Sequence, residues 1–163
     1  MKHSIYLGLG SNLNDRLKNL VAAIAAMTPT IKILRTSPIY ETAPWGFEDQ
    51  GKFLNQAVAA QTDLTPKELL GHLKNIETEV GRTATFRNGP REIDIDILFY
   101  DNYILDTDDL TIPHARIEER AFMLAPLAEI AEDFIHPVSG QTIAQLLSKV
   151  DTDGVKSFEA AEN

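Results

Sequence analysis

Cysteine is absent from this chain of 163 residues, which excludes disulfide bonds, zinc fingers and thiolate catalysis. No apolar run approaches the roughly 18 residues of a membrane span, and the N-terminus lacks the charged and then apolar segments of a signal peptide. No internal repeat and no linker rich in Gly, Ser or Pro divides the sequence. We therefore expect a cytoplasmic protein without a membrane partner, folded as one domain over residues 1–163 with a polar, loosely held tail over 151–163.

Positive charge is scarce as well. Fifteen Lys and Arg residues stand against 24 Asp and Glu residues, so the net charge is −9. This charge repels nucleic acid and anionic membranes at long range, and we expect no nucleic-acid partner. Any phosphate chemistry must therefore use local positive charge or metal ions. Apolar residues nevertheless make up 44% of the chain, enough for a well-formed core and against general disorder.

The hydrophobic pattern predicts the order β-α-β-β-α-β followed by short helices. Strands are expected over 4–9, 31–40, 53–62 and 92–100, and helices over 13–27, 66–80, 115–119, 121–131 and 142–149. The second long helix has a capping box of Thr65 and Glu68, has Pro66 as its first residue, and ends at Gly81. This order is typical of an α+β fold, a ferredoxin-like sandwich of helices on an antiparallel sheet, here with C-terminal helical additions.

The last predicted strand carries two carboxylates. Alternation places Ile93, Ile95, Ile97 and Phe99 on one of its faces. Asp94 and Asp96 therefore share the opposite face, with Cα atoms about 7 Å apart for a rise of roughly 3.3 Å per residue. Neighbouring carboxylates repel each other unless cations lie between them, and Mg²⁺ prefers such oxygen ligands.

Three arginines and no acidic residue precede this strand within ten positions, namely Arg82, Arg87 and Arg91. A flexible arginine loop beside a metal-binding carboxylate pair is what a polyphosphate requires, because guanidinium groups bind its oxygens. The alternative is a solvated face of an edge strand, on which the same carboxylates pair with the arginines. The residues alone leave both interpretations open.

Other signals are weaker. No P-loop is present, and GLGSNL at 8–13 has Leu where a dinucleotide fingerprint needs its third Gly, which favours a tight turn from strand to helix. His114 precedes two arginines and either faces the same anion or lies at the surface. Phe53 and Phe122 would ordinarily be core residues. Asn55 shares the face of Phe53, and this combination also suits a planar heterocycle.

Seven segments in the same order resemble the 6-hydroxymethyl-7,8-dihydropterin pyrophosphokinase family, over about residues 4–150. They are GLGSNL at 8–13, YETAPWG at 40–46, FLN at 53–55, GR at 81–82, GPREIDIDI at 89–97, IPH at 112–114 and RAFML at 120–124. The resemblance implies a ferredoxin-like fold and the transfer of diphosphate from ATP to the pterin hydroxymethyl group, with release of AMP. It also implies small-molecule substrates only and, as we expect, a monomer.

The resemblance assigns a role to each matching residue. Asp94 and Asp96 would bind two Mg²⁺ ions, and with Arg82 and Arg91 they would be the catalytic residues. Phe53 and Phe122 would enclose the pterin, whose edge would meet Asn55 and the backbone at Thr42, Ala43 and Trp45. The ATP site would comprise Glu77, Arg82, Arg91, Ile97, His114 and Arg120.

Three positions depart from the common family pattern: Asn88 replaces a frequent Trp, Ala84 a frequent Arg, and Ala115 a Tyr. We expect the 82–91 loop to close differently or less tightly for this reason. Two other functions share some of the evidence. A γ-phosphoryl or nucleotidyl transferase would use the same metal pair but different products, whereas a small-molecule sensor or RNA-binding module would not need paired carboxylates beside arginines.

Overall fold

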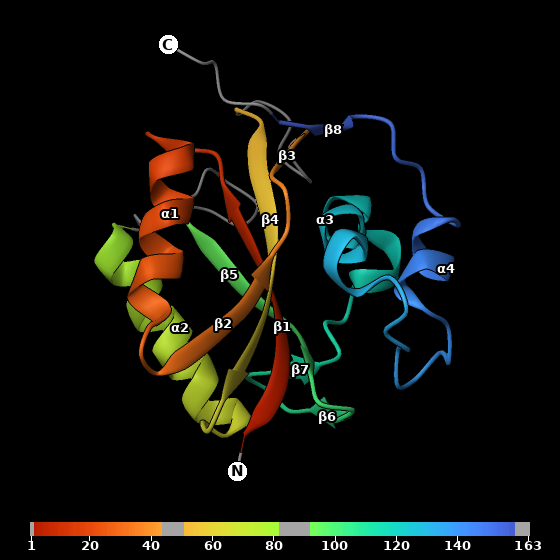
Figure 1. Cartoon of the computed structure of the whole chain (residues 1–163), viewed down its shortest axis with the longest axis horizontal. Helices are drawn as coiled ribbons and strands as arrows, with labels where there is room; N and C mark the ends of the chain where they lie inside the picture. Colours follow the sequence, from red (N-terminus) through yellow and green to blue (C-terminus); the bar gives the residue numbers. More distant parts are fainter. Residues whose placement is uncertain (1, 44–50, 82–91, 159–163) are drawn as a thin grey trace.

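The computed structural model describes residues 2–43, 51–81 and 92–158, and these form a sheet with helices on both faces (Figure 1). Along the chain the elements are β1 (His3–Ser11), α1 (Arg16–Met27), β2 (Ile31–Thr36), β3 (Tyr40–Thr42), β4 (Phe53–Thr62), α2 (Pro66–Val80), β5 (Asp94–Tyr100), β6 (Leu105–Asp106), β7 (Thr111–Ile112), the 3₁₀ turn η1 (Ile117–Glu119), α3 (Ala121–Ala131), α4 (Ile143–Leu147) and β8 (Val155–Ser157). No helix in these ranges is both long enough and apolar enough to cross a bilayer.

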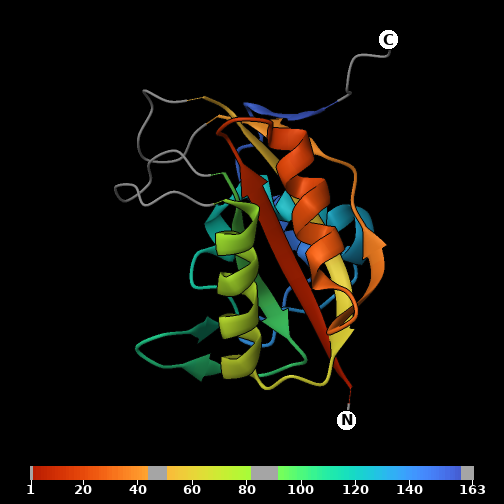
Figure 2. The same ribbon diagram turned by 90° about the vertical axis from the view of Figure 1, so that its left-hand side faces the viewer.

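The six-stranded sheet has the order β5-β1-β4-β3-β8, and β2 pairs with another part of β4. Every pairing between these strands is antiparallel. Helices α1 and α2 cover one face of the sheet, and α3 and α4 cover the other (Figures 1 and 2). This is the α+β sandwich that the element order predicts, with β1 and β4 at its centre.

Each face of the sheet has its own apolar core. Large side chains of α1, α2 and the alternate strand residues Ile5, Leu7 and Leu9 fill the first, and all three strand residues are at most 2% exposed. The second core lies under α3 and α4 and includes Leu98 and Leu127. Burying each such side chain contributes about 1.5–3 kcal/mol, so the two cores hold the sheet from both sides.

Local signals set the ends of the helices. The Thr65–Glu68 capping box forms as predicted, with Glu68 N–H donating to Thr65 Oγ1 at 3.2 Å and Thr65 N–H donating to Glu68 Oε1 at 3.0 Å. Gly81 ends α2 with φ of 110°, a left-handed conformation that glycine adopts without strain. Helix α1 begins three residues later than predicted, because Asp15 is its N-cap.

The predicted single face of β5 is wrong at its end. The register with β1 pairs Leu7 with Ile97 but Tyr6 with Phe99, so Leu98 is an extra residue in a bulge. Phe99 therefore packs in the α3/α4 core and not beside Ile97, while Tyr100 reaches the α1/α2 core. A single inserted residue reverses the alternation beyond it.

Two further differences involve β3. The predicted strand over 31–40 is interrupted at 37–39, where Ser37 Oγ accepts the N–H of Ala57 at 2.9 Å. Residues 155–157 lie in the stretch predicted to be a loosely held tail, yet they form β8 and pair with β3. The C-terminal strand thus covers one edge of a very short strand.

Candidate active site

Two glycines in β1 form the floor of the site, on the sheet face that α3 covers further along. Gly10 pairs with Asp94 on one side and with Asn55 on the other, while Gly8 pairs with Asp96. The carboxylates of β5 and the amide of β4 therefore flank a strand that presents no side chain between them. With strands about 4.8 Å apart, the two flanks are separated by roughly 10 Å.

The close approach at Gly10 requires the absence of a side chain. A Cβ atom at this position would lie 3.0 Å from Asn55 Nδ2 and 3.3 Å from Phe53 Cδ1. Both side chains therefore lie directly over the Gly10 backbone.

Asp94 and Asp96 lie on the same face, as the alternation predicts, and both are partly exposed. The Asp96 side chain retains 40% of its accessible surface. Within residues 2–43, 51–81 and 92–158, no group of three or more metal-ligating side chains gathers. Two partly exposed carboxylates on one face suit Mg²⁺, which usually keeps water and substrate phosphate oxygens among its ligands.

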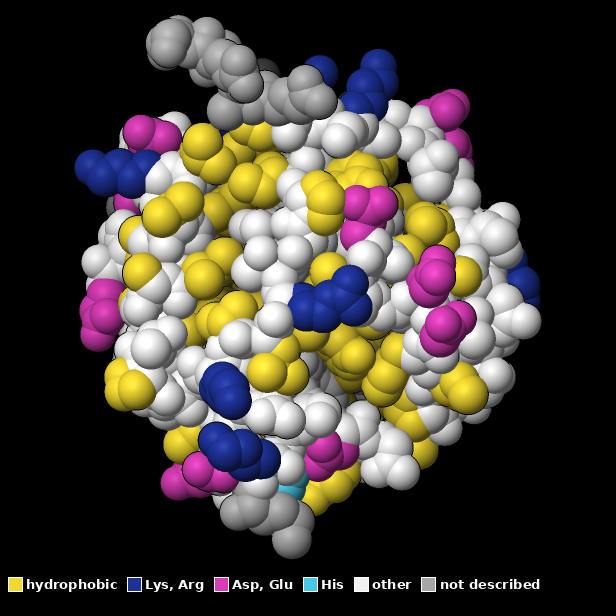
Figure 3. Space-filling model, in the orientation of Figure 1, with side chains coloured by type: hydrophobic (Ala, Val, Ile, Leu, Met, Phe, Trp, Pro, Cys, Tyr) yellow, Lys and Arg dark blue, Asp and Glu magenta, His cyan; other side chains and the backbone are white. Residues whose placement is uncertain are grey.

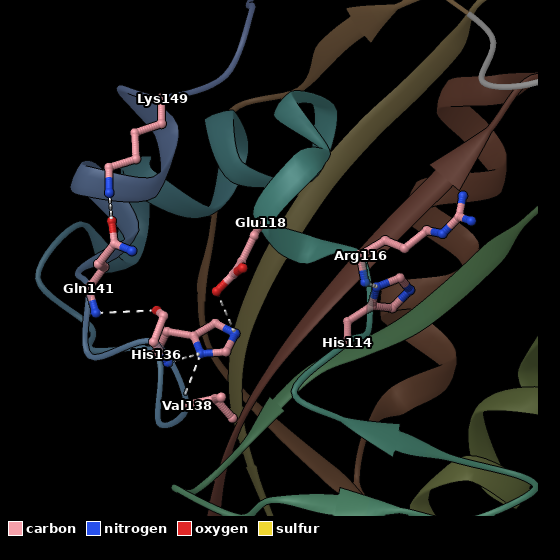
Figure 4. Close-up of polar contacts among 8 residues, drawn as sticks. His114, Arg116, Glu118, His136, Val138, Gln141 and Lys149 are labelled. Carbon is pink, nitrogen blue, oxygen red and sulfur yellow. Dashed lines mark hydrogen bonds and ion pairs between the residues drawn. The ribbon is translucent and has the colours of Figure 1, made fainter.

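His114 approaches the carboxylate pair from the segment after β7. Its backbone N–H donates to Leu98 O at 3.0 Å, and its Nε2 lies 4.0 Å from Asp96 Oδ2. Nδ1 accepts the backbone N–H of Arg116 at 3.2 Å, close by in Figure 4. Burial, with Arg120 and Arg116 nearby, lowers the pKa of His114 to about 4. The ring is therefore neutral near pH 7, and Nε2 carries the proton that faces Asp96.

Arg120 adds positive charge beside the same carboxylates. Burial lowers the pKa of Arg120, whereas the negative charges of Asp96 and Asp94 favour its protonated form. Its Cζ lies 5.5 Å from the centroid of the Phe122 ring. Arginine remains charged under such conditions, so this segment combines a fixed cation with the neutral donor of His114.

The opposite flank is a polar and aromatic pair. Thr42 Oγ1 donates to Asn55 Oδ1 at 2.6 Å, and the two residues are only 2% and 7% exposed. Phe53 is partly exposed and belongs to neither apolar core, and Phe122 packs at the margin of the second core. Ala43, the next residue after Thr42, is exposed.

Two predicted ATP-site residues lie on the side of the sheet that α1 and α2 cover. Glu77, only 5% exposed, accepts the backbone N–H of Ile95 at 2.9 Å through Oε2. Ile97 is 5% exposed, and its side chain packs in the α1/α2 core. A contact of Ile97 with ATP would therefore have to come from its backbone. Arg82, Arg91 and Trp45, as well as Arg87, Asn88 and Ala84, lie outside the described residues.

The sequence did not single out Arg16. Its Nη1 donates to Glu41 Oε2 at 2.8 Å, in β3, and to Lys52 O at 3.0 Å, just before β4. Asn12, the residue after β1, donates to Gly51 O at 3.0 Å. These partners lie 25 to 39 positions further along the chain, and no local pattern connects them.

Comparison with known proteins matches most of the chain. The sequence model of the family described as 7,8-dihydro-6-hydroxymethylpterin-pyrophosphokinase (HPPK) matches residues 6–132. A 2-amino-4-hydroxy-6-hydroxymethyldihydropteridine pyrophosphokinase of Aquifex aeolicus is 47% identical over 135 residues, which are 83% of this chain and 84% of that protein. The protein of the same name in Methylorubrum extorquens is 45% identical over 94% of this chain and 98% of its own length.

Other relatives are much longer. The chain spans 21% of the folic acid synthesis protein fol1 of Pneumocystis carinii, to which it is 44% identical over 154 residues. A crystal structure of HPPK-DHPS of Plasmodium falciparum with pterin and p-hydroxybenzoate has a TM-score of 0.74 at 19% identity, covering 91% of this chain and 42% of that one. At this identity the similarity establishes the fold, and it agrees with the predicted ferredoxin-like sandwich.

Proposed function

Because the chain belongs to the 7,8-dihydro-6-hydroxymethylpterin-pyrophosphokinase family, we propose that it transfers diphosphate from ATP to 6-hydroxymethyl-7,8-dihydropterin and releases AMP. The predicted family is confirmed, and so is the predicted function at the level of the family. Two bacterial relatives with this activity in their names are matched over 84% and 98% of their own length. The proposal rests on these two relatives and the family match, and not on the parts of the longer relatives that this chain does not match.

The single observation that carries a two-substrate site is the arrangement across β1. The carboxylates of Asp94 and Asp96 lie on one side of β1, which carries Gly8 and Gly10, and the Thr42–Asn55 pair lies on the other side. A phosphate chain needs cations and donors, which the first side offers, whereas a flat heterocycle needs a hydrogen-bonding edge and ring faces. The two flanks therefore suit two different ligands held side by side.

Asp94 and Asp96 are the proposed ligands of two Mg²⁺ ions. Bound there, the ions would neutralise and orient the phosphates of ATP. Their partial exposure leaves room for water and phosphate oxygens to complete each coordination sphere. The carboxylates would thus act by holding the metal charge in place beside the phosphates.

His114 and Arg120 are the proposed phosphate ligands among the described residues, together with Arg82 and Arg91 as predicted from the family motif. A neutral imidazole donates one N–H to a phosphate oxygen without depending on pH near neutrality, because its pKa lies at about 4. Arg120 would offset the negative charge that accumulates on the leaving group. Glu77 would act through the β5 backbone that it binds.

Phe53, Phe122, Asn55 and Thr42 are the proposed pterin residues, with Ala43 and Trp45 completing the edge. Asn55 is oriented by the 2.6 Å bond from Thr42, which leaves its Nδ2 over Gly10. No side chain is assigned here as a general base, and phosphoryl transfer through a loose transition state depends chiefly on positioning and charge neutralisation.

The remaining expectations stay predictions: a monomer, one domain, a cytoplasmic location and no nucleic-acid partner. On the face drawn in Figure 3, the described basic side chains are interspersed with acidic ones and form no continuous basic stripe. Sedimentation of the purified protein would test the monomer directly.

Identification of the nucleotide product tests the function. The protein is incubated with ATP, Mg²⁺ and the reduced pterin, and the products are separated by chromatography. AMP formed together with the pterin diphosphate is expected. ADP would instead indicate γ-phosphoryl transfer, inorganic pyrophosphate would indicate nucleotidyl transfer, and either would overturn the proposal.

A further inference from the structure

Arg16 connects the two chain segments that carry the proposed pterin residues. It is the first residue of α1, and its Nη1 has two N–H groups, one for each bond that it makes. One goes to Glu41 Oε2 at 2.8 Å, in β3, and the other to Lys52 O at 3.0 Å, just before β4. Thr42 follows Glu41 directly, and Phe53 follows Lys52.

The C-terminal strand supports the same guanidinium. Phe158 donates its backbone N–H to Ile39 O at 2.9 Å, and its ring lies 5.8 Å from Arg16 Cζ. Strand β8 pairs with β3 from Tyr40 to Thr42. Arg16 therefore contacts β3, the residue before β4 and the residue after β8.

The register of β3 on β4 determines whether Thr42 can reach Asn55, and β3 has only three residues to fix it. Thr42 pairs with Phe53 and Tyr40 with Asn55. A shift of one residue would turn Thr42 to the other face of the sheet, and its bond to Asn55 Oδ1 would be lost. A strand of three residues makes few backbone pairings that could fix its register. Contacts at the ends of the strand therefore contribute to the register.

We propose that Arg16 is a positioning residue for the pterin-binding edge: by holding Glu41 and Lys52 together, it fixes the Thr42–Asn55 pair beside Phe53. The inference rests on the proposed function, because it assigns these residues to the pterin. Arg16 and Glu41 retain 28% and 31% of their side-chain surface, so the pair is too exposed to dominate global stability. We therefore expect loss of this pair to change the position of β3 and not the overall stability of the protein, which distinguishes a positioning role from a merely structural one.

The first test compares Arg16→Met with Arg35→Met. Arg35 is a matched control, because its Nη1 also donates to a backbone carbonyl, that of Ile130 at 3.1 Å, but at the end of α3. AMP release is followed while each substrate is varied. For Arg16→Met, the KM for the pterin should rise roughly tenfold while the KM for ATP stays within about twofold. Arg35→Met should change neither.

Hydrogen exchange in the unliganded protein is the second test. In Arg16→Met the backbone amides of β3 should exchange at least about tenfold faster, while those of β1 and β5 keep their wild-type rates. Unchanged exchange in β3 would overturn the inference whatever the pterin does. Equal acceleration throughout the sheet would also overturn it, since that pattern reports a loss of global stability.

Glu41→Met separates the two bonds of Arg16, because methionine offers the guanidinium no oxygen acceptor. It should raise the KM for the pterin less than Arg16→Met does, because the bond to Lys52 O remains. The double variant should equal Arg16→Met alone, and additive effects would contradict a shared role. A wild-type protein that releases no AMP would overturn the proposed function itself. An active wild type with an equally active Arg16→Met, unchanged in KM, would overturn only the role of Arg16.

Discussion

The two faces of β1 are made from alternating residues of the same strand, yet they serve opposite purposes. Leu7 and Leu9 face α1 and α2 and are almost completely buried, whereas Gly8 and Gly10 face the other way, where Asn55 and Phe53 lie over the Gly10 backbone. One set of residues fills a core, and the other allows side chains of the proposed site to approach the strand closely. Because the side-chain period of a strand is two, nine consecutive residues hold both.

Strand β5 repeats this division. Ile95 and Ile97 are buried against α1 and α2, while Asp94 and Asp96 are partly exposed on the face of Gly8 and Gly10. At this end of β1 and β5, packing and proposed chemistry are therefore on opposite sides of the sheet, and the α3/α4 core lies further along the same face as the site. Substitutions on the two faces of one strand should therefore give opposite results.

The largest expected effect is the loss of a carboxylate. Asp94→Ala or Asp96→Ala should lower kcat by at least about 10²–10³-fold, because each removes a proposed metal ligand and its charge. Unfolding in denaturant should remain unchanged, since both side chains are partly exposed. Leu7→Ala is the control from the other face, and it should cost about 2–5 kcal/mol of stability with little loss of kcat in the folded protein.

Activity within about tenfold of wild type at saturating Mg²⁺ would contradict the two-metal assignment. A large loss of stability in either aspartate variant would contradict the separation of the two faces.

Removal of an aromatic ring should affect pterin binding next most strongly. Phe53→Ala or Phe122→Ala should raise the pterin Kd at least about tenfold and leave ATP binding nearly unchanged, because ring stacking adds about 0.5–1.5 kcal/mol to the burial of the ligand. Titration calorimetry measures the affinities. A core role predicts the reverse, a stability loss of about 3–5 kcal/mol with binding intact in the folded protein.

A methyl group on the glycine floor should have a smaller and position-dependent effect. In Gly10→Ala the new Cβ would meet Asn55 Nδ2 at 3.0 Å and Phe53 Cδ1 at 3.3 Å, so both must move. We expect the KM for the pterin to rise by about tenfold or less. In Gly8→Ala the new Cβ meets Leu98 Cδ2 at 3.3 Å and comes near neither Asn55 nor Phe53, so its cost falls on the α3/α4 core and not on the pterin residues. Equal effects of the two substitutions on pterin KM would contradict the placement of the pterin beside Gly10.

Features that depend on local pattern could be predicted from the sequence. The capping box at Thr65 and Glu68 needs residues three apart, and the shared face of Asp94 and Asp96 needs only the period of a strand. The order of apolar segments predicts the sandwich for the same reason. Roles for Phe53 and Asn55 came from the family resemblance, and the structure brings these two residues together over Gly10.

Features that depend on contacts between distant segments could not be predicted. The bulge at Leu98 arises in the pairing with β1, and nothing within 92–100 signals it. Glu77 looks like an exposed flank of α2 until β5 is placed beside it and Ile95 N–H reaches its carboxylate. The bonds of Arg16 likewise exist only after β3 and the start of β4 have been assembled.

The smallest expected effect is a dependence of the free energy of unfolding on pH, and it arises from His136 between α3 and α4. His136 is 5% exposed, and its Nδ1 accepts the backbone N–H groups of Val138 and Ser139 at 3.1 and 3.2 Å. Its Nε2 lies 3.7 Å from Glu118 Oε1, a contact marked by a dashed line in Figure 4. Burial lowers the pKa of His136 below its usual 6.5, and the charge of Glu118 opposes this only in part.

The sign of the effect follows from the pKa difference between the two states. Below pH 6.5 the unfolded chain binds a proton at His136 that the folded protein resists, so the free energy of unfolding falls as the pH decreases toward the folded-state pKa. Above pH 6.5 the contribution is fully present. One proton limits the slope to about 1.4 kcal/mol per pH unit. In His136→Asn, Oδ1 replaces Nδ1 as the acceptor but does not titrate. Denaturant unfolding at several pH values should therefore show wild type losing more stability than this variant as the pH falls below 6.5, and parallel curves would exclude His136 as the source.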